Sequence, residues 1–85
     1  MYKLGISNKA LKQIEKIKDS VYYRIGDKIN SLENNPRPNG SIKLTDIEGY
    51  RIKVGPFRIL YTINESNKEV IVYNIDKRKD IYKKR

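Results

Sequence analysis

From Gly49 onward, apolar and polar residues alternate along the chain with a period of two. Segments 50–54 and 57–63 each place an apolar side chain at every second position, which is the pattern of β-strands with one buried face. Only Gly55-Pro56 separates them, and this pair predicts a tight turn. We therefore expect an antiparallel hairpin. The later run 70–75 is apolar nearly throughout, as expected of a strand covered on both faces, and its register is not fixed by the sequence.

The first part of the chain is patterned differently. Residues 2–6 alternate and predict a short strand. From Ala10 to Ile17 the apolar residues recur at helical spacing, while lysines and Glu15 occupy the other side, so we expect an amphipathic helix of about three turns. Ser7 or Asn8 can cap it.

A second helix follows with little connecting chain. Asp19-Ser20 can cap it, and its apolar stripe runs from Val21 to Leu32. We expect it to end at Asn34-Asn35, because the residue before a proline is disfavoured in the helical conformation. Two helices joined this tightly predict a helical hairpin.

The order of these elements predicts the fold class. Residues 36–40 are rich in proline, asparagine and glycine and predict a loop, and a short strand is expected around residues 42–44. The expected architecture is α+β: an N-terminal strand, then a helical hairpin packed on one face of a twisted antiparallel sheet of three to four strands. A basic C-terminal tail follows. We expect residues 1–85 to form a single domain.

Composition narrows the functional classes. The 85 residues include 19 Lys and Arg against 10 Asp and Glu, a net charge of +9, which favours a polyanionic partner. Cysteine and histidine are absent, which removes thiolate and imidazole metal ligands and the usual general base. We expect no metal and no cofactor. The apolar runs are far shorter than the roughly 20 residues of a membrane helix, so we expect a cytoplasmic protein with no membrane partner.

The charges of the predicted hairpin are placed unusually. A two-residue turn puts Lys53 directly across from Arg58, with Arg51 two positions along, all on the face away from the helices. Like charges opposite each other destabilise a sheet, and a bound phosphate would relieve this repulsion. The alternative is an ordinary solvated surface whose long side chains splay apart.

The tail adds further basic residues and one tyrosine. Lys77, Arg78 and Lys79 follow directly after the strand expected beside Arg58. Tyr82 has two interpretations: an amphipathic last turn that packs on the sheet, or a phenol that stacks on a base or transfers a proton.

These residues together resemble a known family. "YRIKVGPFRILYTI" followed by "DKRKDIY" is similar to the RelE toxins of the RelE/ParE superfamily, whose usual pattern is Tyr-Arg-Ile-Arg-Val-Gly, then Tyr-Arg-Val-Ile-Tyr, then Gly-His-Arg and an aromatic. The likeness extends to the opening strand, to "ALKQIEKI", to the "NP" after the second helix and to Lys43-Leu44. Lys77 stands where many members have histidine, and Phe57 replaces the commoner tyrosine.

The resemblance implies a RelE-like microbial ribonuclease fold and a specific activity. A RelE-type protein is the toxin of a type II toxin-antitoxin system, a ribosome-dependent endonuclease that cuts messenger RNA, arrests translation and is neutralised by a cognate acidic antitoxin similar to RelB. The family's catalytic positions match Arg51, Lys53, Arg58, Arg78 and Tyr82. We also expect RNA contacts from Lys43, Lys77, Lys79 and Lys83.

Two alternatives remain open. The chain could be a non-catalytic basic module that binds nucleic acid or the ribosome, or a toxin of the ParE branch, which shares the fold and is similar to gyrase poisons. The joint presence of Arg58, Arg78 and Tyr82 favours the RelE branch, because the ParE branch typically lacks this set. The residues do not indicate which group acts as general base or acid.

Overall fold

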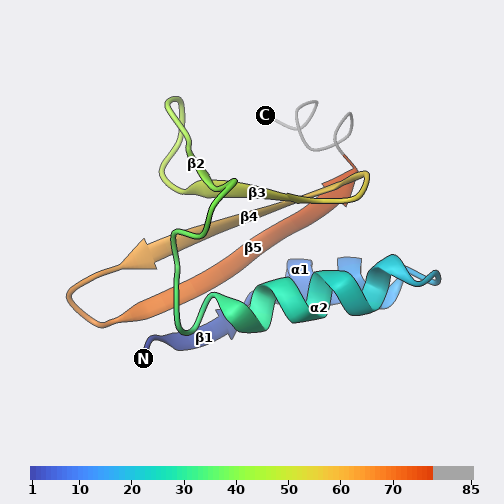
Figure 1. Ribbon diagram of the computed structural model, residues 1–85, viewed down its shortest axis with the longest axis horizontal. Helices are drawn as coiled ribbons and strands as arrows, with labels where there is room; N and C mark the ends of the chain where they lie inside the picture. The colour runs from blue at the N-terminus through green and yellow to red at the C-terminus, as the bar shows by residue number, and fades with distance from the viewer. Residues whose placement is uncertain (78–85) are drawn as a thin grey trace.

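Five strands and two helices make up the computed structural model, which describes residues 1–77 (Figure 1). In chain order the elements are β1 (Lys3–Ile6), α1 (Asn8–Glu15), α2 (Val21–Ser31), β2 (Ile42–Lys43), β3 (Tyr50–Val54), β4 (Phe57–Asn64) and β5 (Glu69–Lys77). The expected basic tail lies outside the described residues, apart from Lys77.

The strands form one sheet in the order β1-β5-β4-β3-β2. Strands β2 to β5 are an antiparallel meander, which confirms the expected antiparallel sheet of three to four strands. The N-terminal strand adds a fifth, because β1 pairs with β5 in parallel, from Lys3 opposite Glu69 to Ile6 opposite Val72. The sheet is therefore mixed, and the α+β class is confirmed.

Both helices lie on the same face of the sheet (Figure 1). The α2 stripe is buried at Val21, Ile25, Ile29 and Leu32, as the helical spacing predicts. It meets apolar residues that alternate along the strands, and the sheet contributes Ile52, Val54, Ile59, Tyr61, Val70, Val72 and Ile75 to the core. This face is therefore filled by the protein itself.

The first helix is shorter than expected. Helix α1 has 8 residues, a little over two turns. The Ser7 hydroxyl accepts a hydrogen bond from the Ala10 amide (3.1 Å), which confirms the predicted cap. At the other end the Ile17 amide donates to the Ile14 carbonyl, three residues back instead of four, so the last turn tightens and regular helix ends before Ile17.

The second helix begins where predicted and ends early. The Asp19 carboxylate accepts a hydrogen bond from the Val21 amide at 2.9 Å. Helix α2 ends at Ser31, whereas Pro36 predicted an end at Asn34-Asn35. Tightened turns fill the interval, as the Leu32 amide donates to the Ile29 carbonyl.

The hairpin turn has the predicted length. Val54 is opposite Phe57, which leaves Gly55-Pro56 as a two-residue connection. Gly55 has φ +57° and proline has a fixed negative φ, the signs of a type II′ turn, which matches the twist of the flanking strands. A Cβ at Gly55 would lie 3.2 Å from a methyl group of Val21, so the tip of the hairpin rests against the start of α2.

The expectation that residues 70–75 are covered on both faces is wrong. Ile71 remains 36% exposed, whereas Val70 and Val72 are fully buried. The β4–β5 register shifts between Leu60 and Tyr61, where Leu60 pairs with Asn74 and Tyr61 with Val72. This β-bulge leaves one extra residue on β5 and changes which side chains face the helices.

Helix α1 is attached to β5 near this bulge. The Gln13 amide nitrogen donates to the Asn74 carbonyl oxygen (2.9 Å), and the Gln13 carbonyl oxygen accepts from the Ile75 amide (2.6 Å). Asn74 is only 8% exposed, so its polar atoms need such a partner. One glutamine thus fixes the position of α1 along the strand.

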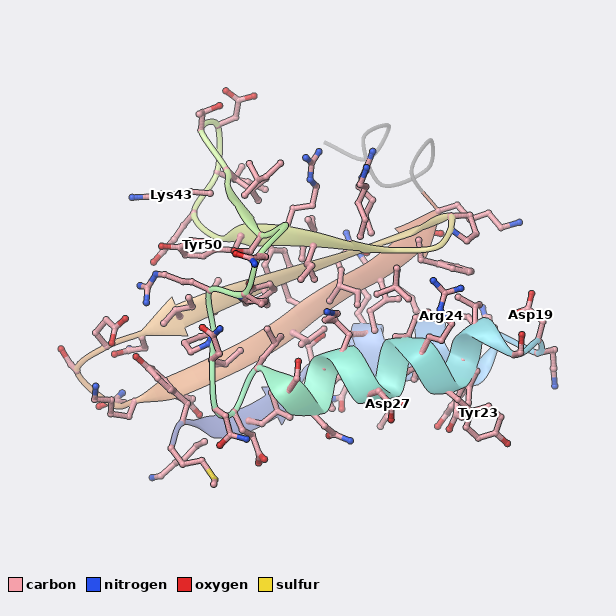
Figure 2. All side chains as sticks on the ribbon, viewed as in Figure 1. Asp19, Tyr23, Arg24, Asp27, Lys43 and Tyr50 are labelled. Carbon is pink, nitrogen blue, oxygen red and sulfur yellow. The ribbon has the colours of Figure 1, made fainter. Side chains whose placement is uncertain are left out.

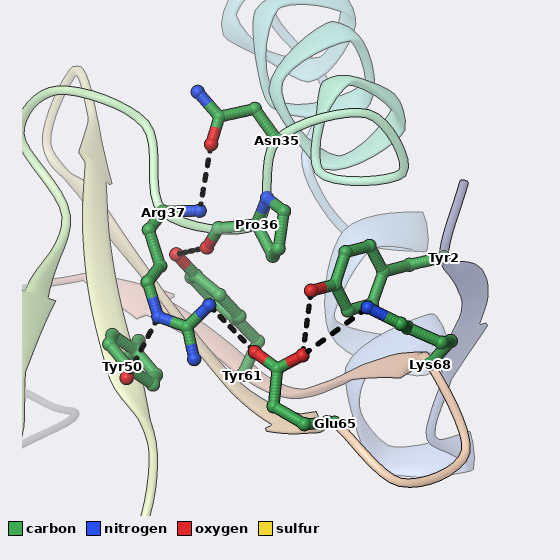
Figure 3. Close-up of polar contacts among 8 residues, drawn as sticks. All are labelled: Tyr2, Asn35, Pro36, Arg37, Tyr50, Tyr61, Glu65 and Lys68. Atoms are coloured by element: carbon green, nitrogen blue, oxygen red, sulfur yellow. Dashed lines mark hydrogen bonds and ion pairs between the residues drawn. The ribbon is translucent and has the colours of Figure 1, made fainter.

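The loop after α2 is held by a polar cluster (Figure 3). Arg37 forms an ion pair with Glu65 at 2.8 Å and donates a hydrogen bond to the Tyr50 hydroxyl at 3.2 Å. Glu65 also accepts from the Tyr2 hydroxyl at 2.8 Å. These contacts join the start of the chain, the 36–41 loop and the β4–β5 turn.

The contacts of the cluster shift the pKa of Glu65 and the pKa of Arg37. The hydrogen bond from Tyr2, and then the one from Arg37, lower the pKa of Glu65. The hydrogen bond to Tyr50, and then the one to Glu65, raise the pKa of Arg37. Beneath them Tyr61 donates to the Pro36 carbonyl at 2.8 Å, and burial raises its pKa.

Gly49→Ala should destabilise the fold by about 1 to 3 kcal/mol, a typical cost of a strained backbone conformation. Gly49 has φ +134°, and a Cβ there would lie 2.9 Å from the Tyr61 carbonyl oxygen. Gly26→Ala is the matched control, because no atom lies within 4 Å of its Cβ position in α2, and it should stabilise by about 0.5 to 1 kcal/mol. Urea denaturation measures both. Equal effects of the two substitutions would contradict the strained backbone conformation and the close contact described for Gly49.

Glu65→Gln should destabilise the protein at pH 7 but not in acid. A carboxylate whose folded pKa is lowered stabilises the fold above its unfolded pKa, about 4.3, and this contribution is lost as the pH falls through the folded value. Unfolding curves of both proteins at pH 7 should therefore differ, and the difference should shrink below about pH 4. Glu15→Gln, an exposed change on α1, is the control. A difference that stays constant with pH would show that the charge of Glu65 contributes nothing.

Candidate nucleic-acid interface

The β3–β4 hairpin brings three predicted site residues together. Lys53 lies directly opposite Arg58, as predicted, and Arg51 lies opposite Leu60. Residues opposite each other in an antiparallel pair share a face of the sheet, and the helix-covered face carries the alternate set with Ile52 and Ile59. Arg51 and Arg58 are therefore diagonal neighbours on the other face, about 7 to 8 Å apart at their backbones.

A carboxylate completes this row of charges. Asp76 on β5 lies opposite Arg58, so that Lys53, Arg58 and Asp76 cross three neighbouring strands on one face; we call them the charged row. Sequence reasoning missed the role of Asp76, because the register of β5 could not be derived. We expect the opposite charge at this register position to offset part of the repulsion between Lys53 and Arg58.

The three cations differ in exposure. Lys53 is exposed and Arg51 is half-buried, whereas Arg58 is only 6% exposed. Arg58 therefore lies on the expected face, away from the helices, but is buried there. A guanidinium with little water around it interacts more strongly with an anion than an exposed one, because the local dielectric constant is lower.

The structure separates the other predicted contacts from the charged row. Lys43 pairs with Tyr50, and its side chain points away from the hairpin (Figure 2). Lys77 lies opposite Phe57, one position after Asp76, and so shares the helix-covered face. Neither joins Arg51, Lys53 and Arg58. The predicted residues Arg78, Lys79, Tyr82 and Lys83 lie outside the described residues.

Residues 1–77 contain no group of three or more His, Cys, Asp or Glu side chains placed to hold a metal ion. Neither helix in this part of the chain is both long enough and apolar enough to cross a membrane.

The fold is that of RelE-type toxins. The isolated RelE toxin of E. coli is 25% identical to this chain and superimposes with a TM-score of 0.78, covering 98% of this chain and 93% of its own. The archaeal RelE–RelB complex from Pyrococcus horikoshii OT3 contains a chain that is 22% identical, with a TM-score of 0.77, covering 91% of this chain and 94% of its own.

Sequence comparison assigns the family. The model of the family described as "ParE toxin of type II toxin-antitoxin system, parDE" matches residues 4–82. A candidate RelE1 toxin of Methanocaldococcus jannaschii is 24% identical over 86 residues, which cover 96% of both chains. The chain belongs to this family and is a RelE-type toxin of the RelE/ParE superfamily.

Asp76→Asn should lower stability at low salt by up to about 1 kcal/mol, the upper value for an opposite-charge pair across strands. Salt screens such contacts, so the loss should shrink at 1 M salt. Asp46→Asn, at an exposed position in the loop before β3, makes the same change in net charge away from the row. Urea unfolding at both salt concentrations measures the effect. Equal losses in the two variants would mean that net charge, and not the charged row, is responsible.

Proposed function

We propose that this toxin is a ribosome-dependent endoribonuclease that cuts messenger RNA. The observation that carries the proposal is the placement of Lys53 directly opposite a nearly buried Arg58, with Arg51 diagonal to it. A phosphate with its negative oxygens is the ligand that such a cluster fits, since arginine offers bidentate contacts and lysine a point charge.

The chemistry is attack by the 2′-hydroxyl on the adjacent phosphorus. The hydroxyl gives its proton to a base and its oxygen bonds to phosphorus. The bond from phosphorus to the 5′-oxygen breaks as that oxygen takes up a proton, so the products end in a 2′,3′-cyclic phosphate and a 5′-hydroxyl. Arg58 stabilises the negative charge that develops on the phosphoryl oxygens. Lys53 and Arg51 orient the scissile phosphate.

We assign proton transfer to Arg78 and Tyr82, which are not part of the charged row. Arg78 assists the departure of the 5′-oxygen. Tyr82 either stacks on a nucleobase or accepts a proton. The normal pKa of tyrosine is near 10, which makes it a weak base at neutral pH unless cations lower it. A weak acid-base set accords with dependence on the ribosome, because alignment of the substrate can supply much of the lowering of the barrier.

The same cations provide the means of control. We propose that an acidic antitoxin segment covers Arg51, Lys53 and Arg58 and excludes RNA. The net charge of +9 favours a flexible acidic partner that folds on binding. RelE–RelB complexes are among the structures that share this fold, which supports a RelB-like partner for this chain.

A gyrase-directed activity is the second candidate, because the matching family is described by ParE. The two functions separate in one pair of assays. Purified toxin added to a translating extract should shorten messengers, with new 5′ ends inside coding regions. It should leave the supercoiling activity of gyrase unchanged. A non-catalytic RNA-binding module would neither shorten messengers nor inhibit gyrase.

Arg58→Ala should lower the rate of messenger cleavage by about 10²- to 10³-fold, as expected for the loss of one electrostatic donor to the transition state. Inducible expression in a bacterium, followed by mapping of messenger 5′ ends, measures the loss together with the relief of growth arrest. Lys3→Ala, at an exposed position on β1, should cut like the parent.

Stability must be measured alongside, because Arg58 is buried. Arg58→Lys keeps the charge and most of the side chain but loses the bidentate fork, and it should also cut slowly. If either folded variant cuts translated RNA at a rate near that of the parent, Arg58 is not catalytic.

A further inference from the structure

A second cationic surface lies on the other face of the sheet. A hollow of about 770 Å³ opens between α1, the α1–α2 connection and the ends of β4 and β5, and five lysines line it. We call it the lysine groove, and its lysines are Lys9, Lys12, Lys16, Lys18 and Lys77. It contains none of the residues of the charged row except Asp76.

The lysines converge for reasons visible in the fold. Lys9, Lys12 and Lys16 are spaced by three and four residues, which places them on one side of α1 and its cap. Along the helix axis, Lys12 lies about 4.5 Å beyond Lys9, and Lys16 lies about 6 Å beyond Lys12. Because Gln13 attaches α1 to β5, this side of the helix is held against the strand that ends in Lys77.

The positive charge of the groove exceeds the negative charge of its lining, which contains five lysines and two carboxylates. Neither ion pair found in residues 1–77, Arg37–Glu65 or Lys68–Glu65, involves a lysine of the groove. The lining includes two carboxylates, and each accepts a backbone hydrogen bond: Asp19 from the Val21 amide and Asp76 from the Lys77 amide. All five lysines are exposed.

Part of the groove lining is apolar. Ile17, Phe57 and Ile75 contribute to its lining, and the ring of Phe57 is half-buried. Nucleic-acid grooves commonly combine a cationic wall that follows the phosphates with an aromatic surface against which a base or sugar packs.

The groove begins where the charged row ends. Phe57 and Lys77 form the pair that follows Arg58 and Asp76 in the β4–β5 register. The charged row and the groove are therefore one residue apart along β4 and β5. They lie on opposite faces of the sheet, at the same end of it. A polyanion that lies on the charged row can continue around this end into the groove.

We propose that the lysine groove binds the sugar-phosphate backbone of RNA outside the segment that is cleaved. The proposal rests on the proposed function for what happens at the charged row, but binding in the groove requires no cleavage. The RNA is either the adjoining messenger or ribosomal RNA, which share this chemistry.

The test compares two double variants of equal charge. Lys12→Gln with Lys16→Gln removes two lysines of the groove, and Lys3→Gln with Lys28→Gln removes two exposed or half-exposed lysines elsewhere. The full-length proteins are titrated with a single-stranded RNA and with vacant ribosomes that carry no messenger, over a range of salt concentrations. Urea unfolding confirms that both variants are folded.

The groove variant should bind at least one probe more weakly than the control does. Loss of two phosphate contacts should reduce the slope of log affinity against log salt by about 1.4 to 1.8. Loss with the single strand identifies messenger as the ligand, and loss with vacant ribosomes alone identifies ribosomal RNA. Equal losses in both variants, or no loss with either probe, would overturn the proposal.

Weaker binding of a co-expressed antitoxin, with both RNA affinities unchanged, would also overturn it in favour of a protein ligand. The proposed nuclease is tested separately. If the parent binds RNA through the groove but cuts no translated messenger, the nuclease proposal fails and the groove assignment stands.

Discussion

The register of the β3–β4 hairpin is the constraint on which the other features depend. A slip of one residue would turn every side chain of a strand to the other face, exposing Ile52 and directing Lys53 toward the helices. The two-residue turn at Gly55-Pro56 and the burial of Ile52, Ile59 and Tyr61 together oppose such a slip. The core therefore holds Lys53 and Arg58 opposite each other, because separating them would disrupt the hydrophobic packing. Repulsion in the charged row is a local cost that the fold offsets through burial elsewhere and through Asp76.

Much of this architecture could be predicted from the sequence. Strict period-two alternation and a two-residue turn determine the hairpin, its register and the common face of Arg51, Lys53 and Arg58. Helical spacing likewise identifies the α2 stripe. What could not be predicted depends on contacts between distant segments. The parallel pairing of β1 depends on a free edge of β5, and the position of Asp76 depends on a bulge for which the run 70–75 carries no periodic signal. The burial of Arg58 could not be predicted either, because alternation indicates the face on which a side chain lies but not how far other residues cover it.

The lysines of α1 also show what the sequence can predict and what only the structure reveals. Their spacing at positions 9, 12 and 16 is plain in the sequence, and on its own it describes an ordinary solvated side of an amphipathic helix. The structure changes this interpretation because Gln13 holds that side against the end of β5, where Lys77 and Phe57 complete a groove. A polar residue within a helix thus has a larger effect on the surface than its own charge suggests. It converts a row of separate lysines into one side of a concave site.

Two cationic surfaces that meet at one end of the sheet suit the proposed nuclease and its weak acid-base chemistry. Without histidine, a protein of this size can accelerate cleavage mainly by stabilising charge and by fixing geometry. Fixing geometry requires contacts away from the reacting phosphate, since binding energy from remote parts of a substrate is what holds the reacting centre in line. Arg58 lies on one side of the sheet end, and the groove offers such remote contacts on the other. An antitoxin that covers only the charged row excludes RNA from the proposed cleavage site and leaves the groove exposed, so that inhibited toxin keeps a surface for RNA. Inhibition of cutting and release from RNA are then separable properties of the complex.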